Sequence, residues 1–332
     1  MELNVVVSVI VPCHNRVEIL MSCLESIANQ TYHEIELILV DDASTEDIHS
    51  ILYEVEFPFR RQPIYIRSDV NIGPGGAREL GRLQATGDYI CYLDSDDTWH
   101  PLKIEKQLAI LQAHPELGMC YCASMNVDHQ TGRRSLRRRS DERFSCILPI
   151  ILVTRPWGTG ACMWARWAVD KIGPWFPGWG REDIEYDLRA GCLDIPITNI
   201  PEVLCYYRVN SGDQLRDTPR EILVQQFISA ELKMAENLIR YGKTKEPFIR
   251  KRMILNLFHL GIELLAHDDY ENAKKCWRTM WRLADREVSV YLFVRVAILL
   301  SSIRIGRILF VLLKRPIRVV MIPLYVRKGE FN

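Results

Sequence analysis

Residues 87–97 read Gly-Asp-Tyr-Ile-Cys-Tyr-Leu-Asp-Ser-Asp-Asp, so a short apolar run leads directly into three carboxylates. The run from Tyr89 to Leu93 has the composition of a strand and is bounded by Gly87 and by the acids. In open α/β sheets, ligands bind outside the carboxyl ends of buried parallel strands. The stretch therefore predicts a buried strand with a ligand site at its end.

The three acids at this strand end are Asp94, Asp96 and Asp97, and they repel one another unless a positive group holds them. A hard divalent cation with oxygen ligands, Mg²⁺ or Mn²⁺, commonly joins such carboxylates to the phosphates of a substrate. The alternative is a solvated acidic loop in front of a helix that starts near Pro101. Two similar strand ends elsewhere in the chain favour the ligand site.

The same order of apolar strand and polar end occurs twice earlier. Residues 5–11 lead into Pro-Cys-His-Asn-Arg, and residues 36–40 lead into Asp-Asp-Ala-Ser. Between them, residues 16–29 carry apolar side chains at the spacing of an amphipathic helix. Strands that alternate with helices predict an α/β fold with right-handed crossovers and a mostly parallel sheet. The polar strand ends would then gather along one edge of that sheet.

Five pieces of the chain, in this order, resemble the family-two inverting glycosyltransferases, which have the nucleotide-sugar-binding GT-A fold. The pieces are Val-Ile-Val-Pro-Cys-His-Asn-Arg (9–16), Ile-Leu-Val-Asp-Asp-Ala-Ser-Thr (38–45), Asn-Ile-Gly-Pro-Gly-Gly-Ala-Arg (71–78), Leu-Asp-Ser-Asp-Asp (93–97) and Trp-Gly-Arg-Glu-Asp (179–183). The resemblance covers roughly residues 5–210. It implies a GT-A catalytic domain over residues 1–214.

The resemblance implies a site for a nucleotide-diphospho-sugar donor, with UDP as the expected nucleotide. The implied donor-binding residues are Pro12, Asn15, Arg16, Asp41, Arg78, Asp94 and Ser95. In the family, the first strand's loop and the first acid of the Asp-Asp pair hold uracil and ribose, and Arg78 would approach the diphosphate. An aspartate can accept a hydrogen bond from a base N–H, which suits Asp41. Alternatively, Asp41 caps a turn or helix.

The resemblance also implies a cofactor, Mn²⁺ or Mg²⁺. Asp96 would bind it, with Asp97 as a possible second ligand, and the ion would stabilise the departing diphosphate. Many relatives carry a histidine shortly after a downstream Tyr-Arg pair, where it completes the metal shell. Here that pair is followed by Val-Asn-Ser-Gly-Asp, so Asn210, Asp213 or water is left to take that place.

Glu182 and Asp183 occupy the position where the family carries a catalytic carboxylate. Asp183 is the predicted base, which would deprotonate the acceptor hydroxyl as its oxygen attacks the anomeric carbon in one inverting displacement. The alternative is an acidic helix start, since negative charge is favourable in the first turn of a helix. The Trp-Gly-x-Glu-Asp phrase also occurs in galactosyl- and N-acetylgalactosaminyl-type transferases.

Composition sets further limits. The chain has 332 residues, no net charge and ten scattered cysteines without zinc-type spacing. No secretory signal is evident, so buried, reduced cysteines in a cytoplasmic protein are expected. Residues 133–139 carry five arginines, which either meet a phosphate of the donor or of a lipid-diphosphate acceptor, or form a solvated loop. No aromatic residues alternate with them, so nucleic acid is not an expected partner.

The last third of the chain has the sequence pattern of helices. Residues 215–287 are predicted as a helical extension with a tetratricopeptide-like hairpin, which must pack on a neighbour to bury its apolar face. Residues 288–332 form an apolar tail interrupted by basic residues, with no charge-free stretch long enough to span a membrane. Its basic side predicts a helix lying on anionic lipid at the inner face of the plasma membrane. The alternatives are a docked terminal helix or a homodimer seam.

The resemblance, together with these patterns, implies a metal-assisted, inverting glycosyltransferase that acts on a hydroxyl of a surface glycan or of its lipid-linked precursor. The competing interpretation is a non-catalytic nucleotide-sugar-binding or scaffolding protein with a transferase-like fold. A nucleotidyltransferase is disfavoured, because residues 9–16 lack the glycine-rich, lysine-bearing start of that class.

Overall fold

The computed structural model describes residues 5–177, 180–209, 220–266 and 268–284. The chain forms two compact units, residues 1–230 and 231–332, and each is described by itself. The predicted boundary between residues 214 and 215 and the predicted tail from residue 288 lie outside the described residues. These domain limits therefore stay predictions.

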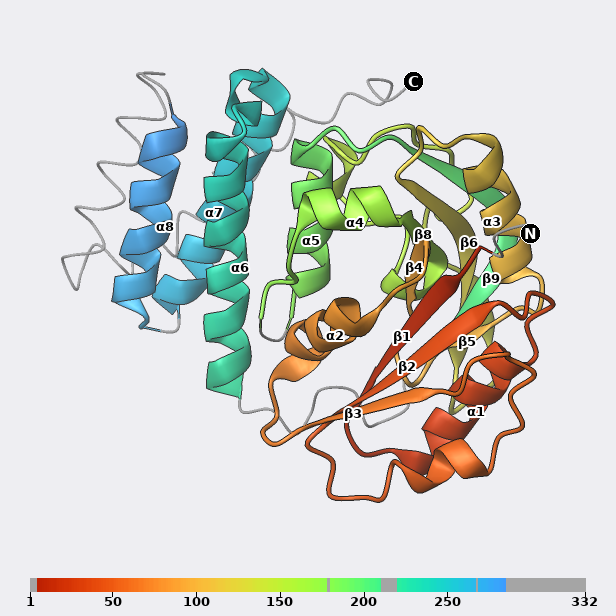
Figure 1. The fold of residues 1–332 in the computed structure, drawn as a ribbon. Coiled ribbons are helices and arrows are strands. Elements are labelled where there is room, and N and C mark those ends of the chain that lie inside the picture. Colours follow the sequence, from red (N-terminus) through yellow and green to blue (C-terminus); the bar gives the residue numbers. More distant parts are fainter. Residues whose placement is uncertain (1–4, 178–179, 210–219, 267, 285–332) are drawn as a thin grey trace. The chain divides into compact units, whose positions relative to one another are not determined.

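The first unit is built on a nine-stranded sheet (Figure 1). One half holds four neighbouring parallel strands, in the order β3 (Ile64–Ser68), β2 (Ile35–Asp42), β1 (Val7–Cys13) and β4 (Tyr89–Tyr92). The other half continues with β8 (Cys162–Ala165), β6 (Met119–Asp128), β9 (Ile197–Val209) and β5 (Thr98–Trp99), while β7 (Arg134–Leu136) pairs with β6. The α/β fold with a mostly parallel sheet is confirmed.

Helices cover both faces of this sheet, with α2, α4 and α5 on one side and α1 and α3 on the other (Figure 1). Their bounds are α1 (Val17–Ala28), α2 (Gly73–Gln84), α3 (Lys103–Ala113), α4 (Arg166–Ile172) and α5 (Glu182–Cys192), with short 3₁₀ turns η1 (Ser50–Tyr53), η2 (Ile150–Leu152) and η3 (Thr159–Ala161). Helix α1 buries the predicted stripe of Leu20, Cys23, Leu24 and Ile27. Strands β1 and β2 are buried at every residue, as expected for strands covered on both faces.

The strand register brings the polar strand ends together. Cys13, the last residue of β1, pairs with Asp41 near the end of β2, and Ile10 of β1 pairs with Tyr92 at the end of β4. Because these strands are parallel, the loops that follow all three leave from the same edge of the sheet. The predicted gathering of polar ends at one edge is confirmed.

The second unit contains the end of α6 (Arg220–Arg240), the turn η4 (Lys243–Lys245), α7 (Pro247–Ala266) and α8 (Tyr270–Leu283). Helices α7 and α8 pack through Phe258 and Trp277, whose ring centres lie 5.9 Å apart. A side chain at Gly261 of α7 would meet the Trp277 ring at 2.8 Å, so this contact needs glycine. In the described part of the chain, no helix combines the length and the apolarity that a membrane crossing requires.

None of the ten cysteines, all of which lie in the described residues, forms a disulfide, and nine of them are buried. Burial raises the pKa of Cys91 and Cys205, which keeps such thiols protonated and unreactive at neutral pH. These side chains therefore act as small apolar groups of the core, the structural role that the sequence predicts for them.

Candidate functional site

A cavity of about 570 Å³ opens at the edge of the sheet where β1, β2 and β4 end. Nine of the eleven predicted site residues line it: Pro12, Arg16, Arg78, Asp94, Ser95, Asp96, Asp97, Glu182 and Asp183. They come from the loops after β1 and β4, from α2 and from the first turn of α5. The two that do not line the cavity are Asn15 and Asp41.

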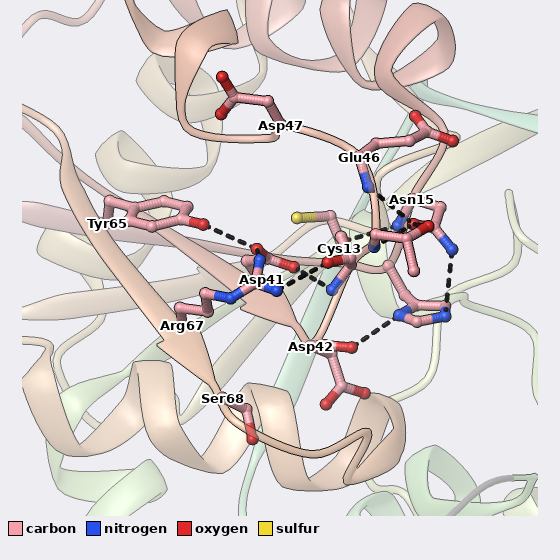
Figure 2. Close-up of polar contacts among 12 residues, drawn as sticks. Cys13, Asn15, Asp41, Asp42, Glu46, Asp47, Tyr65, Arg67 and Ser68 are labelled. Carbon is pink, nitrogen blue, oxygen red and sulfur yellow. Dashed lines mark hydrogen bonds and ion pairs between the residues drawn. The ribbon is translucent and has the colours of Figure 1, made fainter.

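Asn15 joins the loop after β1 to the loop after β2 (Figure 2). Its side-chain Oδ1 accepts hydrogen bonds from the backbone N–H of Thr45 at 2.8 Å and from the Thr45 hydroxyl at 3.1 Å. Its own N–H donates to the Ser44 hydroxyl at 2.7 Å. Asn15 and Arg16 both have left-handed backbone conformations, with φ of 56° and 69°. The amide of Asn15 therefore shapes the rim of the site rather than its interior.

Asp41 is fully buried at the end of β2, in a network that Figure 2 draws. Its carboxylate accepts hydrogen bonds from the Ser44 N–H at 2.8 Å, from the Tyr65 hydroxyl at 2.7 Å and from the guanidinium of Arg67. Burial would raise the pKa of Asp41, but these donors outweigh it and hold the pKa below its usual value. The turn-capping alternative for Asp41 is thus realised, and its contact with a base stays a prediction.

Asp42, the next residue, lines the cavity and caps the start of α2. Its carboxylate accepts hydrogen bonds from the N–H groups of Ile72 at 2.7 Å and Gly73 at 2.8 Å. This satisfies donors that would otherwise be orphaned at the helix N-terminus. The second acid of the Asp-Asp pair therefore fixes the position of α2 beside the cavity.

Arg78 of α2 bridges two acids instead of pointing freely into the cavity. Its Nη2 lies 2.6 Å from Asp94 and its Nη1 lies 2.8 Å from Glu182, and the side chain is only 4% exposed. Glycine makes this approach possible, because a Cβ at Gly75 would stand 2.1 Å from the carbonyl oxygen of Phe176. Both terminal nitrogens of the Arg78 guanidinium are bound to carboxylates, so the predicted contact of Arg78 with a diphosphate stays a prediction.

The acids after β4 carry more negative charge than nearby cations balance. Arg16 lies 3.5 Å from Asp96, and the backbone N–H of Arg208 donates to Asp97 at 3.1 Å. Burial and the neighbouring acids nevertheless raise the pKa of Asp97 well above its usual value, and the pKa of Asp96 is raised for the same reasons. Among the described residues, no three His, Cys, Asp or Glu side chains converge as a ready-made metal cluster.

Asp183, in the first turn of α5, is held by an arginine that sequence reasoning missed. Arg155 places its Nη1 2.6 Å from Asp183 and its Nε 2.6 Å from Asp187, one helical turn further on. Asp187 also accepts from the indole N–H of Trp157 at 2.8 Å. Burial would raise the pKa of Asp183, but Arg155 together with Arg78, the Ile184 N–H and Arg137 outweighs this and lowers it, whereas burial raises the pKa of Glu182. Asp183 is therefore an ionised carboxylate at neutral pH.

Another wall of the cavity comes from the second half of the sheet, and of its residues the sequence connects only Arg137 with the site, through the arginine-rich stretch 133–139. It includes Asn126 of β6, Arg137 after β7, and Tyr207 and Arg208 of β9. Sequence patterns give one usable signal here, the arginine-rich stretch that contains Arg137. Tyr207 needs glycine nearby, since a Cβ at Gly158 would meet its hydroxyl at 2.2 Å.

The sequence profile of Glycosyl transferase family 2 matches residues 8–171, which contain β1, β2, β4 and the acids after β4. The chain belongs to glycosyltransferase family 2. This confirms the predicted family, and four of the five sequence pieces lie within the matched residues.

Two relatives illustrate the similarity in sequence. An uncharacterized glycosyltransferase of Nostoc sp. is 31% identical over 220 residues, which are 62% of this chain and 66% of that protein. The UDP-Glc:alpha-D-GlcNAc-diphosphoundecaprenol beta-1,3-glucosyltransferase WfaP of Escherichia coli is 35% identical over 106 residues, 32% of this chain and 41% of that one. The family 2 chain spans only 15% of a longer Rickettsia bellii glycosyltransferase.

The fold matches that of S. aureus TarS residues 1–349, solved in complex with UDP-GlcNAc. The TM-score is 0.67, the identity is 17%, and the match covers 89% of each chain. At this identity the likeness concerns the fold, and it confirms the predicted GT-A fold.

Proposed function

We propose that this family 2 chain transfers a sugar from a nucleotide diphosphate, with UDP as the nucleotide, to a hydroxyl of a surface glycan or its lipid-linked precursor. The reaction would be a metal-assisted single displacement with inversion. One observation carries the proposal: the acid cluster after β4 and the ionised Asp183 of α5 line the same cavity. That arrangement offers a cation site and a general base in one cavity.

The donor would bind at the edge where β1, β2 and β4 end. Pro12 and Arg16 line the cavity there, and Asp41 lies just behind the lining. UDP is favoured because the TarS structure of the same fold was solved with UDP-GlcNAc, and because the E. coli relative is named for UDP-Glc. Arg16 would meet the phosphates, since it lines the cavity at this edge, whereas Arg78 is engaged by two acids.

The acid cluster fits a hard divalent cation. Asp96 and Asp97 have pKa values raised by burial and by neighbouring negative charge, which is the electrostatic signature of a site that lacks positive charge. Their carboxylate oxygens are the ligands that Mg²⁺ and Mn²⁺ prefer. Asp96 and Asp97 would hold the cation, with Asp94 and Ser95 beside it. When bound, such an ion supplies Lewis-acid stabilisation of the diphosphate leaving group.

Asp183 would act as the base. Its Oδ2 is held by Arg155, and its Oδ1 accepts from the Ile184 N–H at 2.8 Å, so the carboxylate is fixed in place and ionised. An acceptor hydroxyl in the cavity would give its proton to this carboxylate as its oxygen attacks the anomeric carbon. Glu182 would act indirectly, because its carboxylate is bound to Arg78 at 2.8 Å.

The proposal also includes the acceptor and the cellular location of the protein. The E. coli relative is named for a diphosphoundecaprenol-linked substrate, which supports a lipid-linked acceptor. The basic tail of residues 288–332 would hold the protein on anionic lipid at the inner face of the plasma membrane, where such acceptors are found.

The test replaces the base without changing its volume. Asp183→Asn should abolish transfer while UDP binding in the presence of Mn²⁺ is retained, because an amide cannot take the proton. Asp170→Asn, at an exposed site on α4, is the matched control and should leave both unchanged. A loss of UDP affinity equal to the loss of transfer would mark Asp183 as a donor-binding residue. Transfer at the wild-type rate would defeat the proposal of a base.

A further inference from the structure

The cations that line the cavity differ in how far they are already neutralised. Arg78 is bound by Asp94 and Glu182, and Arg16 lies 3.5 Å from Asp96. Arg137 is different: within the described parts of the chain, its guanidinium makes no ion pair, and it lies 5.2 Å from the centre of the Tyr207 ring. An arginine fork on a ring face keeps its N–H groups available for a carboxylate or a phosphate.

Arg137 is held in place by its backbone. Its N–H donates to the carbonyl of Ser124 on β6 at 2.8 Å, and its own carbonyl accepts from the N–H and the hydroxyl of Ser140 at 3.1 and 2.9 Å. The Tyr207 ring beneath it is buried, and its hydroxyl accepts from the Ala161 N–H at 3.1 Å. The guanidinium thus rests on a rigid platform at the cavity wall.

Further arginines flank Arg137 in the sequence and lie outside the lining of the cavity. Strand β7 is exposed at all three residues and pairs only with β6 among the described strands. Arg133, Arg134 and Arg138 are exposed on this hairpin and do not line the cavity. Arg139, by contrast, is bound by Glu142 at 2.7 Å. We call Arg133, Arg134, Arg137 and Arg138 the hairpin arginines.

We propose that the hairpin arginines bind the phosphate of an anionic acceptor, with Arg137 contacting it at the cavity wall. Arginine recognises phosphate by paired, charge-assisted hydrogen bonds, which suits these residues. A donor held at the acid cluster would not contact Arg133, Arg134 and Arg138, which lie outside the lining of the cavity. A substrate that enters over the hairpin would meet all four. This rests on the proposed transferase function and specifies the chemistry of its acceptor.

The experiment uses the full chain with saturating UDP and Mg²⁺, so that the donor diphosphate site is filled. Binding of geranyl diphosphate and of uncharged geraniol is measured by calorimetry. The diphosphate should bind and geraniol should not. Arg137→Gln should weaken diphosphate binding about ten-fold, as expected for a lost charge-assisted pair. The double variant Arg134→Gln/Arg138→Gln should weaken it less and should flatten its salt dependence.

Arg143→Gln is the matched control, because Arg143 is exposed in the following loop and does not line the cavity. Equal effects of Arg137→Gln and Arg143→Gln, or equal binding of the two geranyl compounds, would overturn the inference. Weaker UDP binding in Arg137→Gln would assign this arginine to the donor and also overturn it. Failure of the wild type to bind UDP would instead defeat the proposed function itself, so the two failures are distinguishable.

Discussion

Arg155 and Asp183 form a 2.6 Å ion pair, although 28 residues separate them in the sequence. The same guanidinium binds Asp187 through its Nε at 2.6 Å, and the Arg155 side chain is only 8% exposed. Asp183 and Asp187 lie one turn apart on α5, where like charges repel. Arg155 removes this repulsion and sets the charge of the proposed base.

The first prediction is that Arg155 sets the acidic limit of activity. Asp183 must be ionised to accept a proton, and Arg155 makes the largest of the contributions that keep its pKa below the usual value, against the effect of burial. Without Arg155 that pKa rises, so the acidic limb of the profile of kcat/KM against pH moves to higher pH. Activity in the acid range should fall by at least about ten-fold, since general-base catalysis typically contributes 10²–10⁴-fold.

Arg155→Gln alone leaves the buried Asp187 and the half-buried Asp183 without the arginine that binds them, which threatens folding. The double variant Arg155→Gln/Asp187→Asn removes one positive and one negative charge together, and Asp187→Asn alone is its control. The limb should move in the double variant but not in the control. A profile that scales down uniformly at every pH would assign Arg155 a purely structural role.

Much of the site follows from short-range patterns. An apolar run that ends in acids predicts both a buried strand and where its polar end lies, and parallel pairing then brings three such ends to one edge. The sequence alone therefore predicts that Asp94, Asp96 and Asp42 lie near one another, and all three line the cavity. The buried stripe of α1 follows from helical periodicity in the same way.

The partners of these side chains do not follow from short-range patterns. Arg155 reaches Asp183, and Arg78 reaches Glu182 across 104 residues, through the packing of separate elements. No local pattern encodes such pairs. The nearest sequence signal is the pair Asp183 and Asp187, four residues apart on α5. Two acids at this spacing favour a cation nearby, but the sequence does not indicate which residue supplies it. The hydrogen bond between Asn15 and the loop after β2 also cannot be read from the sequence. The sequence therefore predicts that Asn15 contacts the donor, and it does not predict that Asn15 holds the two loops together.

A second prediction concerns the acid cluster. Asp96→Asn should reduce the Mn²⁺-dependent affinity for UDP by at least about ten-fold, because a neutral amide is a poorer ligand for a hard cation. The fold should persist, since the pKa of Asp96 is raised by burial and by Asp94, which shows that its negative charge is not stabilised in place. Calorimetry with and without Mn²⁺ measures this. Metal-dependent affinity equal to that of wild type would remove Asp96 from the cation site.

A third prediction tests the packing that brings α2 to α5. In Gly75→Ala the new methyl group would stand 2.1 Å from the Phe176 carbonyl oxygen and 3.2 Å from Glu182. Because moving the backbone costs energy, we expect the free energy of unfolding to fall by about 1–3 kcal/mol, despite the better helix propensity of alanine. Gly191→Ala is the control, because its methyl group meets the flexible Leu148 side chain at 2.9 Å. Thermal unfolding should show the larger drop in Tm for Gly75→Ala; equal drops would refute this account.

A fourth prediction concerns the tail, residues 288–332. If it lies on anionic membrane, each Lys or Arg near the surface adds about 1 kcal/mol of binding. Removing it should release the protein from anionic vesicles, while UDP binding persists because all proposed donor residues precede residue 184. Replacing Arg304, Arg307, Arg315 and Arg318 by Gln should weaken vesicle binding and flatten its salt dependence. Equal flotation of wild type and variant, or an unfolded truncated protein, would favour a docked helix or a dimer seam.

The last prediction concerns a buried acid at the start of β2, remote from the cavity. Glu36 is 3% exposed and accepts hydrogen bonds from the Ser8 hydroxyl at 2.6 Å and from the Thr86 N–H and hydroxyl at 2.8 and 2.6 Å, with Arg61 at 3.3 Å. Burial would raise its pKa, but these donors hold it below the ordinary value of 4.5. The ionised group therefore stabilises the fold above that value, and the contribution disappears as the pH falls through the lowered pKa.

Glu36→Gln should cost about 1–3 kcal/mol of folding stability at neutral pH. Its stability deficit relative to wild type should shrink on acidification below about pH 4.5, whereas Glu34→Gln, at a more exposed pair, should show little deficit at any pH. Denaturant unfolding at several pH values measures both, and a deficit of Glu36→Gln that stays constant with pH would show that its charge does not stabilise the fold.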